Sequence, residues 1–572
     1  MRVVRTGLPA LIIIAAMVFA LAKGRGNVPE EVLATSVPEV LAISAPEVLA
    51  TSVPEVLATS VPEVLAISVP EEARDLESGR VLFERHCTVC HGAEGRGDGQ
   101  AAYLLYPAPR DFTSGRFRLV STQNGIPTQR DIITTIKRGM PGSAMPPWEW
   151  LAEEDLWGLA LYVRHLAIEG QVANMLSWAE EEGDELSPAE ARAIVNERMV
   201  PGDPIDVGAP AADDPTSLHE GQRIYSKTCA PCHGADGTGS GAASEAGELR
   251  NEDGTPNSAR DFTAGIFKGG STHADIVRRI VGGLPGSPMP ATSLDNQNQV
   301  AMLAAYVRSL IRPGAEERVV QRRRTVPVMR LRGEVPSDPE DPAWARTRGV
   351  WVALMPLWWR DLRVDGVVVR ALHNGETISF RLTWRDTARD DDLLGAQSFS
   401  DSAAIEVSVE RDPPLFAMGA TGQPVDIALW RAAWEADAHA ASGVRERYPN
   451  MLDDAFPERL GDLNEQSLTA RALGNSVALP ARPAGAEALM AEGFGTVGPR
   501  KHDASSWTAR GTWSDGYWDV VFSRSMAAEI EGEPALLPGL SAFLAFAVWD
   551  GAFFDRNGQK SVSVWHRVEV AP

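Results

Sequence analysis

Two short runs of this chain combine residues that can attach and ligate an iron cofactor. Residues 87–91 read Cys-Thr-Val-Cys-His, and residues 229–233 read Cys-Ala-Pro-Cys-His. A Cys-x-x-Cys-His run is typical of c-type haem attachment, in which two thiols add to the haem vinyl groups and the histidine ligates the iron. The predicted attachment residues are Cys87, Cys90, Cys229 and Cys232, and the predicted proximal iron ligands are His91 and His233.

The cysteine count favours this interpretation over two simpler ones. All 4 cysteines of the 572-residue chain lie in the two runs, so none is left for a structural disulfide. A redox-active cysteine pair usually lacks the trailing histidine, and a zinc site needs further ligands at finger-like spacing. Because c-type haem is attached outside the cytoplasmic membrane, the runs also predict an exported protein.

Length and charge limit the possible function classes. A chain of 572 residues is long enough for about three or four domains. Its net charge of -23 disfavours nucleic acid as a partner, because the phosphates would be repelled. The same charge suits protein partners that carry basic surfaces.

Residues 1–27 have the pattern of an export signal. Arg2 and Arg5 precede an apolar run, residues 8–22, which ends in Ala-Leu-Ala. This pattern is typical of a secretory signal peptide, and the run is short for a membrane-spanning helix, which needs about 20 apolar residues. An uncleaved N-terminal anchor stays open as the alternative. Residues 28–72 repeat a short Pro-rich unit, from which we expect a linker without a packed core.

Residues 73–170 and 217–314 form an internal duplication, here called the first and second units. Arg-Asp-Phe-Thr occurs at 110–113 and again at 260–263, and related Leu-Ala-x-Tyr-Val-Arg segments stand at 159–164 and 303–308. The closing segments of both units carry apolar residues at helical spacing. Each unit is therefore predicted to be all-α, and residues 171–216 between them to be an acidic, Pro-rich linker with one helix from Pro188 to Met199.

Both units resemble class I cytochrome c domains, in which the first and last helices cross through a glycine and an aromatic residue. The corresponding pairs are Gly79/Tyr162 and Gly221/Tyr306. The resemblance implies a distal methionine ligand in a loop before the closing helix, which gives Met145 in the first unit and Met289 in the second. Met140 competes for the first position, although Leu284 stands at its counterpart. The simpler alternative is that these methionines pack in the core.

Histidine–methionine ligation predicts the chemistry of the two units. With both axial positions filled by protein, oxygen or peroxide finds no open site, and methionine raises the haem potential. We therefore expect single-electron transfer. A di-haem peroxidase, which needs an open or displaceable ligand, is the less favoured alternative.

Residues 315–572 change to strand-like patterns. Residues 366–372 and 377–384 alternate in polarity around His-Asn-Gly-Glu, which predicts a β-hairpin. Further strands are predicted at 403–409, 517–522, 541–549 and 562–570. Many strands with few strong helices predict an all-β sandwich.

This C-terminal region also resembles the γ subunits of ethylbenzene-dehydrogenase type, which accompany type II members of the DMSO reductase family. The resemblance rests on segments that occur in order from about Asp341, including Pro-Pro-Leu-Phe-Ala-Met-Gly at 413–419 and Gly-Phe-Gly-Thr at 493–496. It implies one non-covalent haem b held between a methionine, Met418, and a lysine, Lys501. Lys560 and His502 are the alternatives to Lys501.

The combined resemblances imply an electron-transfer subunit with two haem c and one haem b. Its expected partners are a molybdenum-cofactor catalytic subunit, an iron–sulfur subunit, and a soluble or membrane electron carrier. A redox sensor module that binds haem or another ligand is the alternative from a different class. The substrate of such a complex is not encoded in this chain.

Overall fold

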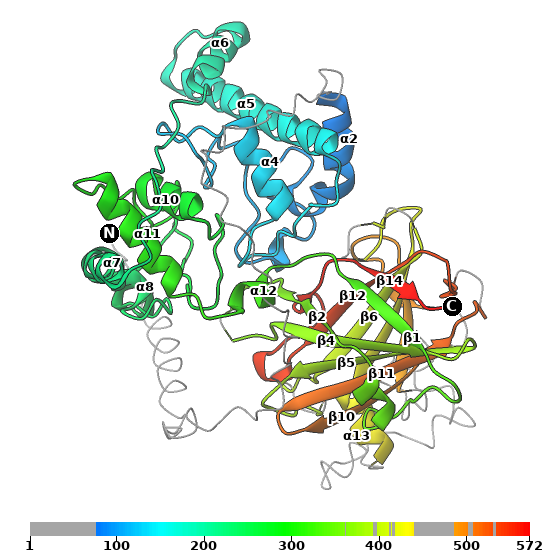
Figure 1. Ribbon diagram of the computed structural model, residues 1–572. Helices are drawn as coiled ribbons and strands as arrows, with labels where there is room; N and C mark the ends of the chain where they lie inside the picture. Colours follow the sequence, from blue (N-terminus) through cyan, green and yellow to red (C-terminus); the bar gives the residue numbers. More distant parts are fainter. Residues whose placement is uncertain are drawn as a thin grey trace, which may run out of the picture. The chain divides into compact units, whose positions relative to one another are not determined.

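Helices occupy the N-terminal half of the described chain and strands the C-terminal half in the computed structural model (Figure 1). The structure describes residues 76–360, 362–392, 397–410, 413–414, 418–439, 485–500, 507–529 and 533–572. All of these belong to one compact unit that runs from Ser68 to Pro572. The predicted signal segment, the Pro-rich repeats, Lys501 and His502 lie outside the described residues.

The first unit is built on a close crossing of its first and last helices. A Cβ atom at Gly79 would lie 2.0 Å from the carbonyl oxygen of Gly158, so only glycine allows this approach. Tyr162 packs its ring on Phe83, with 5.2 Å between ring centroids. The helices of this unit are α2 (Leu76–His86), α3 (Thr88–His91), the 3-10 turn η4 (Ala102–Leu104), α4 (Gln129–Arg138) and α5 (Glu153–Glu182).

The second unit repeats this arrangement. A Cβ atom at Gly221 would lie 2.2 Å from the carbonyl oxygen of Met302, and Tyr306 packs on Tyr225 with ring centroids 5.2 Å apart. Its helices are α7 (Pro215–Thr228), α8 (Ala230–His233), α9 (Ala242–Glu245), α10 (His273–Gly282) and α11 (Gln297–Ser309). The two units therefore share one order of helices, as the duplicated sequence predicts.

The segment between the units contains the predicted helix, at Pro188–Arg198, but part of the linker expected before it also belongs to a helix. Helix α5 continues through Gly170 to Glu182 and ends at Gly183, which adopts a left-handed conformation. Helix α6 (Pro188–Arg198) follows, with a capping box at Ser187. Apolar residues of both helices form a buried cluster of Ala167, Val172, Ala191, Val195 and Met199. Most of this segment is thus a packed helical hairpin.

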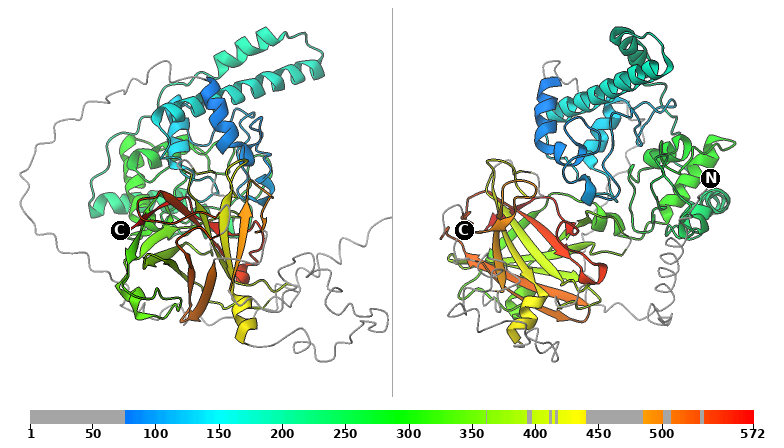
Figure 2. Two further views of the ribbon diagram at one scale, coloured as in Figure 1. Left: turned by 90° about the vertical axis from the view of Figure 1, so that its right-hand side faces the viewer. Right: turned by 180° about the vertical axis from the view of Figure 1, so that it is seen from behind.

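Fourteen strands of the described C-terminal residues join in one mixed sheet (Figures 1 and 2). The strand order along its main path is β10-β11-β5-β4-β1-β14-β12-β6-β7-β8-β9, and β1 pairs in parallel with both β4 and β14. The strands are β1 (Thr325–Arg330), β2 (Val350–Ala353), β3 (Met355–Pro356), β4 (Gly366–His373), β5 (Thr377–Arg385), β6 (Ser402–Ser408), β7 (Val425–Arg431), β8 (Ala486–Ala491), β9 (Gly498–Pro499), β10 (Thr508–Ser514), β11 (Tyr517–Ser525), β12 (Ala542–Trp549), β13 (Ser561–Val562) and β14 (His566–Val570).

The sheet folds over so that its two halves share a core. Trp430 of β7 packs edge-on against Trp384 of β5 and Trp518 of β11, at ring-centroid distances of 6.3 and 5.0 Å. Since β7 lies far from β5 and β11 in strand order, these contacts cross the interior between the two halves. The predicted hairpin is confirmed as β4 and β5, joined at Asn374.

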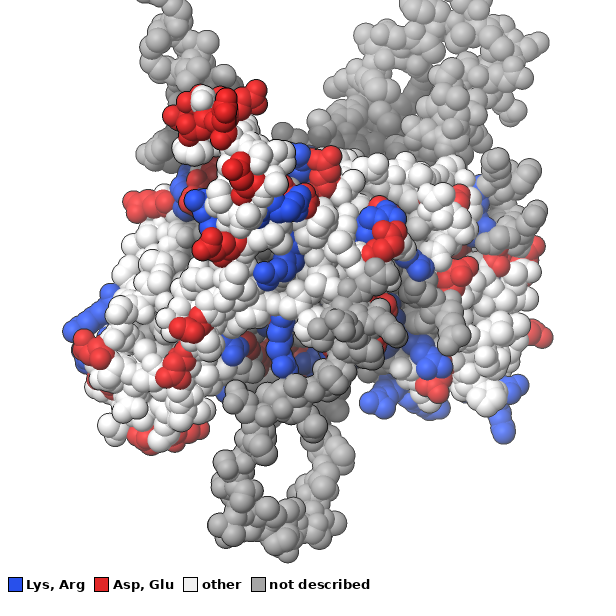
Figure 3. Space-filling view, turned by 90° about the horizontal axis from the view of Figure 1, so that it is seen from above, with Lys and Arg blue, Asp and Glu red and all other residues white. Residues whose placement is uncertain are grey.

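Short helices complete the described chain: α12 (Ala315–Val319), η5 (Pro342–Arg346), α13 (Ala432–His439) and η7 (Gly551–Phe553). In the space-filling view, Lys and Arg are interspersed with Asp and Glu, so the net negative charge does not form a uniform layer on that face (Figure 3). Among the described helices, none is long and apolar enough to cross a membrane.

Candidate haem sites

The first Cys-x-x-Cys-His run forms the short helix α3, which directly follows α2. His91 Nδ1 lies 3.0 Å from the backbone carbonyl oxygen of Arg110, and its ring stacks on Phe112 with centroids 4.6 Å apart. A hydrogen bond from Nδ1 to a carbonyl leaves Nε2 as the ligating nitrogen. Burial lowers the pKa of His91, which favours the neutral imidazole that ligation requires.

The second run repeats these contacts on helix α8. His233 Nδ1 lies 3.4 Å from the carbonyl oxygen of Arg260, and the ring stacks on Phe262 at 4.3 Å. The duplicated Arg-Asp-Phe motif therefore supplies both the carbonyl acceptor and the stacking ring in each unit. None of the four predicted attachment residues, Cys87, Cys90, Cys229 and Cys232, forms a disulfide.

The two methionine loops have the same backbone connections. The Met140 amide donates to the Met145 carbonyl at 3.0 Å, and the Leu284 amide donates to the Met289 carbonyl at 3.1 Å. This correspondence aligns Met145 with Met289 and Met140 with Leu284, as the sequence comparison predicts. Met140 and Met145 both line the cavity beside the first haem run, so the geometry alone leaves Met140 as a competing ligand.

A cavity of about 680 Å³ runs from the first haem run into the C-terminal domain. At one end it is lined by Cys87, Cys90, His91, Met140 and Met145 of the first unit. Further along, its walls come from β6, β7, β8 and β12, from the segment between β6 and β7, and from the segments that follow β8 and β12. The residues are Ala404, Met418, Ile427, Leu429, Leu489, Phe494, Val497, Trp549 and Lys560. This second part is mostly apolar and contains both a thioether and an amine, the donor set that the sequence analysis predicts for haem b.

Met418 lies in a strained turn at the wall of the cavity. Its φ of 106° is uncommon for a residue with a side chain. Its amide donates to Glu406 Oε1 at 3.3 Å, which fixes the turn against β6. Burial raises the pKa of Glu406 to about 8.

Lys560 and Met418 line the same cavity, which Lys268 of the second unit also lines. Lys560 Nζ lies 4.8 Å from the ring centroid of Trp549. Burial lowers the pKa of Lys560, and the neighbouring Glu406 opposes that shift. The sequence placed Lys560 in a polar Asn-Gly turn, and the turn is present, with Asn557 at a positive φ. Its position beside the cavity is set by tertiary packing, which the local sequence does not encode.

Four cations from the two units gather beside the first haem run. Arg110, Arg118 and Lys268 line the cavity, and burial together with the positive charges of Arg260, Arg118 and Arg110 holds the pKa of Lys268 well below its ordinary value. Arg118 follows Arg110 at the same spacing at which Lys268 follows Arg260, so equivalent positions of the duplicated units converge here. Asp253 is a nearby acid, whose pKa is lowered mainly by hydrogen bonds from Thr255 and further by the charges of Arg118 and Arg110. Such a cluster is suited to the anionic propionate groups of a haem.

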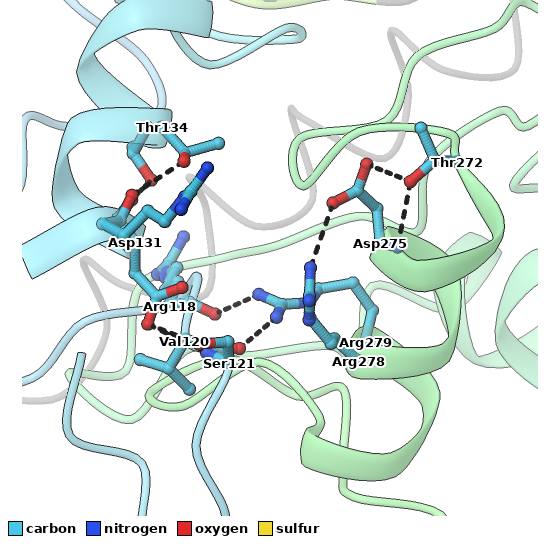
Figure 4. Close-up of polar contacts among 11 residues, drawn as sticks. Arg118, Val120, Ser121, Asp131, Thr134, Thr272, Asp275, Arg278 and Arg279 are labelled. Carbon is cyan, nitrogen blue, oxygen red and sulfur yellow. Dashed lines mark hydrogen bonds and ion pairs between the residues drawn. The ribbon is translucent and has the colours of Figure 1, made fainter. Parts of the chain in front are cut away.

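The two units are joined by direct polar contacts (Figure 4). Arg279 of α10 donates to the backbone carbonyl of Arg118 at 3.2 Å and also to that of Val120. Arg118 in turn donates to Asn251 of the second unit at 3.0 Å. Guanidinium groups therefore tie the chain segment before α4 to the second unit.

The first unit also contacts the C-terminal domain. The Tyr106 amide donates to the Leu357 carbonyl at 3.0 Å, and the Trp359 amide donates to the Tyr106 carbonyl at 2.7 Å. The Tyr106 ring stacks on Trp358 with centroids 5.2 Å apart. This bridge lies close in sequence to Leu104 and Leu105, which line the shared cavity.

Comparison with protein families identifies both halves of the chain. A cytochrome c family model matches residues 76–167 and again residues 218–310. A family model described as ethylbenzene dehydrogenase matches residues 341–561. The matched ranges enclose both haem runs, the predicted methionine ligands of the first and second units, and the cavity wall that carries Met418 and Lys560.

Three curated relatives each match less than half of this chain. The γ subunit of dimethylsulfide dehydrogenase from Rhodovulum sulfidophilum is 28% identical over 275 residues, which are 45% of this chain and 84% of the relative. The γ subunit of chlorate reductase from Ideonella dechloratans is 23% identical over 259 residues, which are 44% of this chain and 86% of the relative. A candidate haem subunit of respiratory nitrate reductase from Haloferax mediterranei is 26% identical over 250 residues, which are 42% of this chain and 71% of the relative.

These relatives confirm the predicted class of electron-transfer subunit. The two family models account for two unlike kinds of candidate haem site in one chain, since a γ-type domain follows two cytochrome units. The chain thus consists of two cytochrome c domains and a C-terminal domain of the ethylbenzene dehydrogenase family.

Proposed function

We propose that this protein is the three-haem electron-transfer subunit of an exported molybdenum oxidoreductase complex. The observation that carries the proposal is the shared cavity, which contains the first Cys-x-x-Cys-His run at one end and Met418 with Lys560 at the other. One continuous space for two redox groups supports a relay within one chain, because fusion replaces a diffusional encounter by a high effective concentration.

The residues that would hold each haem follow from the cavity and from the duplication. Cys87, Cys90 and His91 would hold the first haem c with Met145, and their counterparts in the second domain would hold the second. For haem b we propose Met418 and Lys560, because both line one apolar wall. When bound, haem iron ligated in this way supplies one-electron chemistry.

The arrangement of cations supports an order for the three groups. Haem b shares its cavity with the first haem c, and the cations Arg110, Arg118 and Lys268 stand where the first and second cytochrome domains meet. We propose that the first haem c is the middle member of the relay. An iron–sulfur subunit would then exchange electrons at the haem b end, and an external carrier at the second cytochrome domain.

The substrate of the complex is not expected to touch this chain. The relatives are subunits of complexes named for dimethylsulfide and chlorate, so related γ chains serve different substrates. In this proposal the chain's own residues bind and orient redox groups and exclude water from them. The catalytic site belongs to a molybdenum-cofactor subunit.

The haem content of the purified full chain tests the proposal. After acid-acetone extraction, pyridine spectra should show two haem c retained on each chain and one haem b in the extract. Met418→Ala should reduce the extractable haem and leave the covalent haem count unchanged. A chain that is fully loaded with haem c and releases no haem b would contradict the three-haem assignment.

A further inference from the structure

Three buried aspartates meet at the ends of three strands of the C-terminal domain. Asp386 directly follows β5, Asp401 directly precedes β6, and Asp550 directly follows β12. Their side chains are 4%, 0% and 5% exposed. One ligand atom from each lies within 4.8 Å of the others, which brings three carboxylate groups into one small buried space.

The strand pairing explains why these residues converge. Strands β6 and β12 are antiparallel neighbours with Ser402 opposite Trp549, so Asp401 and Asp550 extend the same end of the pair. Asp386 comes from β5, which pairs with β4 and β11 in the other half of the folded sheet. The cluster therefore spans the two halves.

Two carboxylate oxygens of this cluster have no hydrogen-bond partner among the described residues. Asp386 Oδ2 and Asp550 Oδ1 are fully buried and accept no hydrogen bond from the described residues. Asp401 differs, because Oδ1 accepts from the Gly551 amide at 2.9 Å and Oδ2 accepts from Trp518 Nε1 at 2.9 Å. These donors hold the Asp401 carboxylate in place, while the unpartnered oxygens of its two neighbours remain available to a ligand. An unpaired buried carboxylate is costly unless a cation or a proton neutralises it.

In the part of the chain that the structure describes, no ion pair joins a cation to these three aspartates. Arg360 is the cation that acts on Asp550, and its guanidinium already makes two hydrogen bonds to Asp555, at 2.6 and 2.7 Å. Asp390 adds a fourth carboxylate, with a further unpartnered oxygen, Oδ2.

We propose that Asp386, Asp401 and Asp550 bind one Ca²⁺ ion. Calcium takes oxygen ligands at about 2.3–2.6 Å, so oxygens on opposite sides of one ion lie up to roughly 5 Å apart, which accommodates the observed cluster. The ion would join β5 of one half of the sheet to β6 and β12 of the other. It would also brace the cavity wall, because Ser400 and Ser402, which flank Asp401, and Trp549, which precedes Asp550, all line the shared cavity.

The test uses the full, haem-loaded chain. The protein is dialysed against EDTA, transferred to metal-free buffer and titrated with Ca²⁺, or with Mg²⁺ in a parallel sample. Calorimetry should give one Ca²⁺ site per chain, and the thermal midpoint of the C-terminal domain should rise on Ca²⁺ addition. No saturable Ca²⁺ binding, or equal affinity for Mg²⁺, would overturn the assignment.

Matched substitutions locate the site. Asp386→Asn removes one negative charge with little change in shape and should abolish Ca²⁺ binding and the associated thermal shift. Asp515→Asn makes the same chemical change in the exposed turn between β10 and β11, at a positive φ that asparagine tolerates, and should leave binding unchanged. Retention of full Ca²⁺ affinity in Asp386→Asn would overturn the proposed ligand set. If that variant fails to fold, the wild-type titration still decides whether the ion binds.

Discussion

Leu104 of the first cytochrome domain lies directly against Gly558 of the C-terminal domain. A Cβ atom at Gly558 would stand 2.4 Å from Leu104 Cδ1, closer than a real Cβ contact allows. Both residues line the shared cavity. The absence of a side chain at position 558 therefore permits close approach of the two domains between the candidate haem c and haem b sites.

Gly558→Val should separate the domains at this contact and slow electron transfer between haem b and the first haem c. Overpacking at a tight contact costs about 1–3 kcal/mol. The rate of electron transfer is measured by flash reduction, with the absorption bands of haem b and haem c followed over time. Leu104→Ala in the same chain should restore much of it, since the truncated side chain makes room. An unchanged rate in Gly558→Val would show that this contact does not control the relay.

Lys560→Ala should deplete haem b, because non-covalent haem depends on its axial bonds. Met418→Ala should have the same effect, and both proteins should keep two covalent haem c. Two measurements on the full chain check this result. They are the amount of extractable haem per chain and the low-spin absorption of haem b after haem is added back.

Lys501→Ala and His502→Ala are the controls for the haem b ligand. If Lys560 is the ligand, both controls bind haem b normally. A low-spin spectrum that survives Lys560→Ala but is lost in Lys501→Ala would return the role to Lys501. Loss in His502→Ala alone would transfer it to the histidine.

Met145→Ala should open an iron position in the first cytochrome domain. The variant should lose one sulfur-to-iron charge-transfer band, bind carbon monoxide when reduced, and retain its covalent haem. Met289→Ala should do the same at the second haem. Met140→Ala is the control in the first domain, and carbon monoxide binding by that variant with none by Met145→Ala would reverse the ligand assignment.

The local features of the fold could be read from the sequence because neighbouring residues determine them. Thr128 and Asp131 form the capping box that begins α4, and Asn374 closes the β4–β5 turn through its side chain. The close crossing at Gly79 was expected from the resemblance of both units to class I cytochrome c domains. In each case the deciding contacts span few residues or recur in both units.

Features formed by distant residues could not be predicted in the same way. The cavity is lined by residues from Phe83 to Lys560, and no local sequence pattern predicts which turn will face it. The sequence favoured Lys501, which follows the Gly-Phe-Gly-Thr segment and lies outside the described residues, whereas the described structure places Lys560 in the wall of the cavity that Met418 also lines. The length of α5 was missed for another reason, since an acidic segment suggests solvent although its apolar residues pack on α6.

The last prediction concerns Lys268, which the second cytochrome domain contributes to the cavity beside the first haem run. A cation near the iron disfavours the oxidised, more positive haem and so raises its midpoint potential. Anionic propionates would also offset the burial and the arginine charges that lower the pKa of Lys268. Lys268→Gln should therefore lower the potential of the first haem c by an amount on the order of 50 mV, since 59 mV corresponds to a tenfold change for one electron.

Redox titration of the full chain measures this shift. The first haem is identified by repeating the titration in a Met289→His background, because replacing the methionine ligand lowers the potential of the second haem. Lys268→Arg should retain most of the wild-type potential, as it keeps the charge. Lys227→Gln, on the exposed end of α7 in the same domain, removes an equal charge away from the cavity and should leave the first haem unchanged. A shift confined to the second haem would mean that Lys268 serves its own domain, and the proposed electrostatic link between the two cytochrome domains would fail.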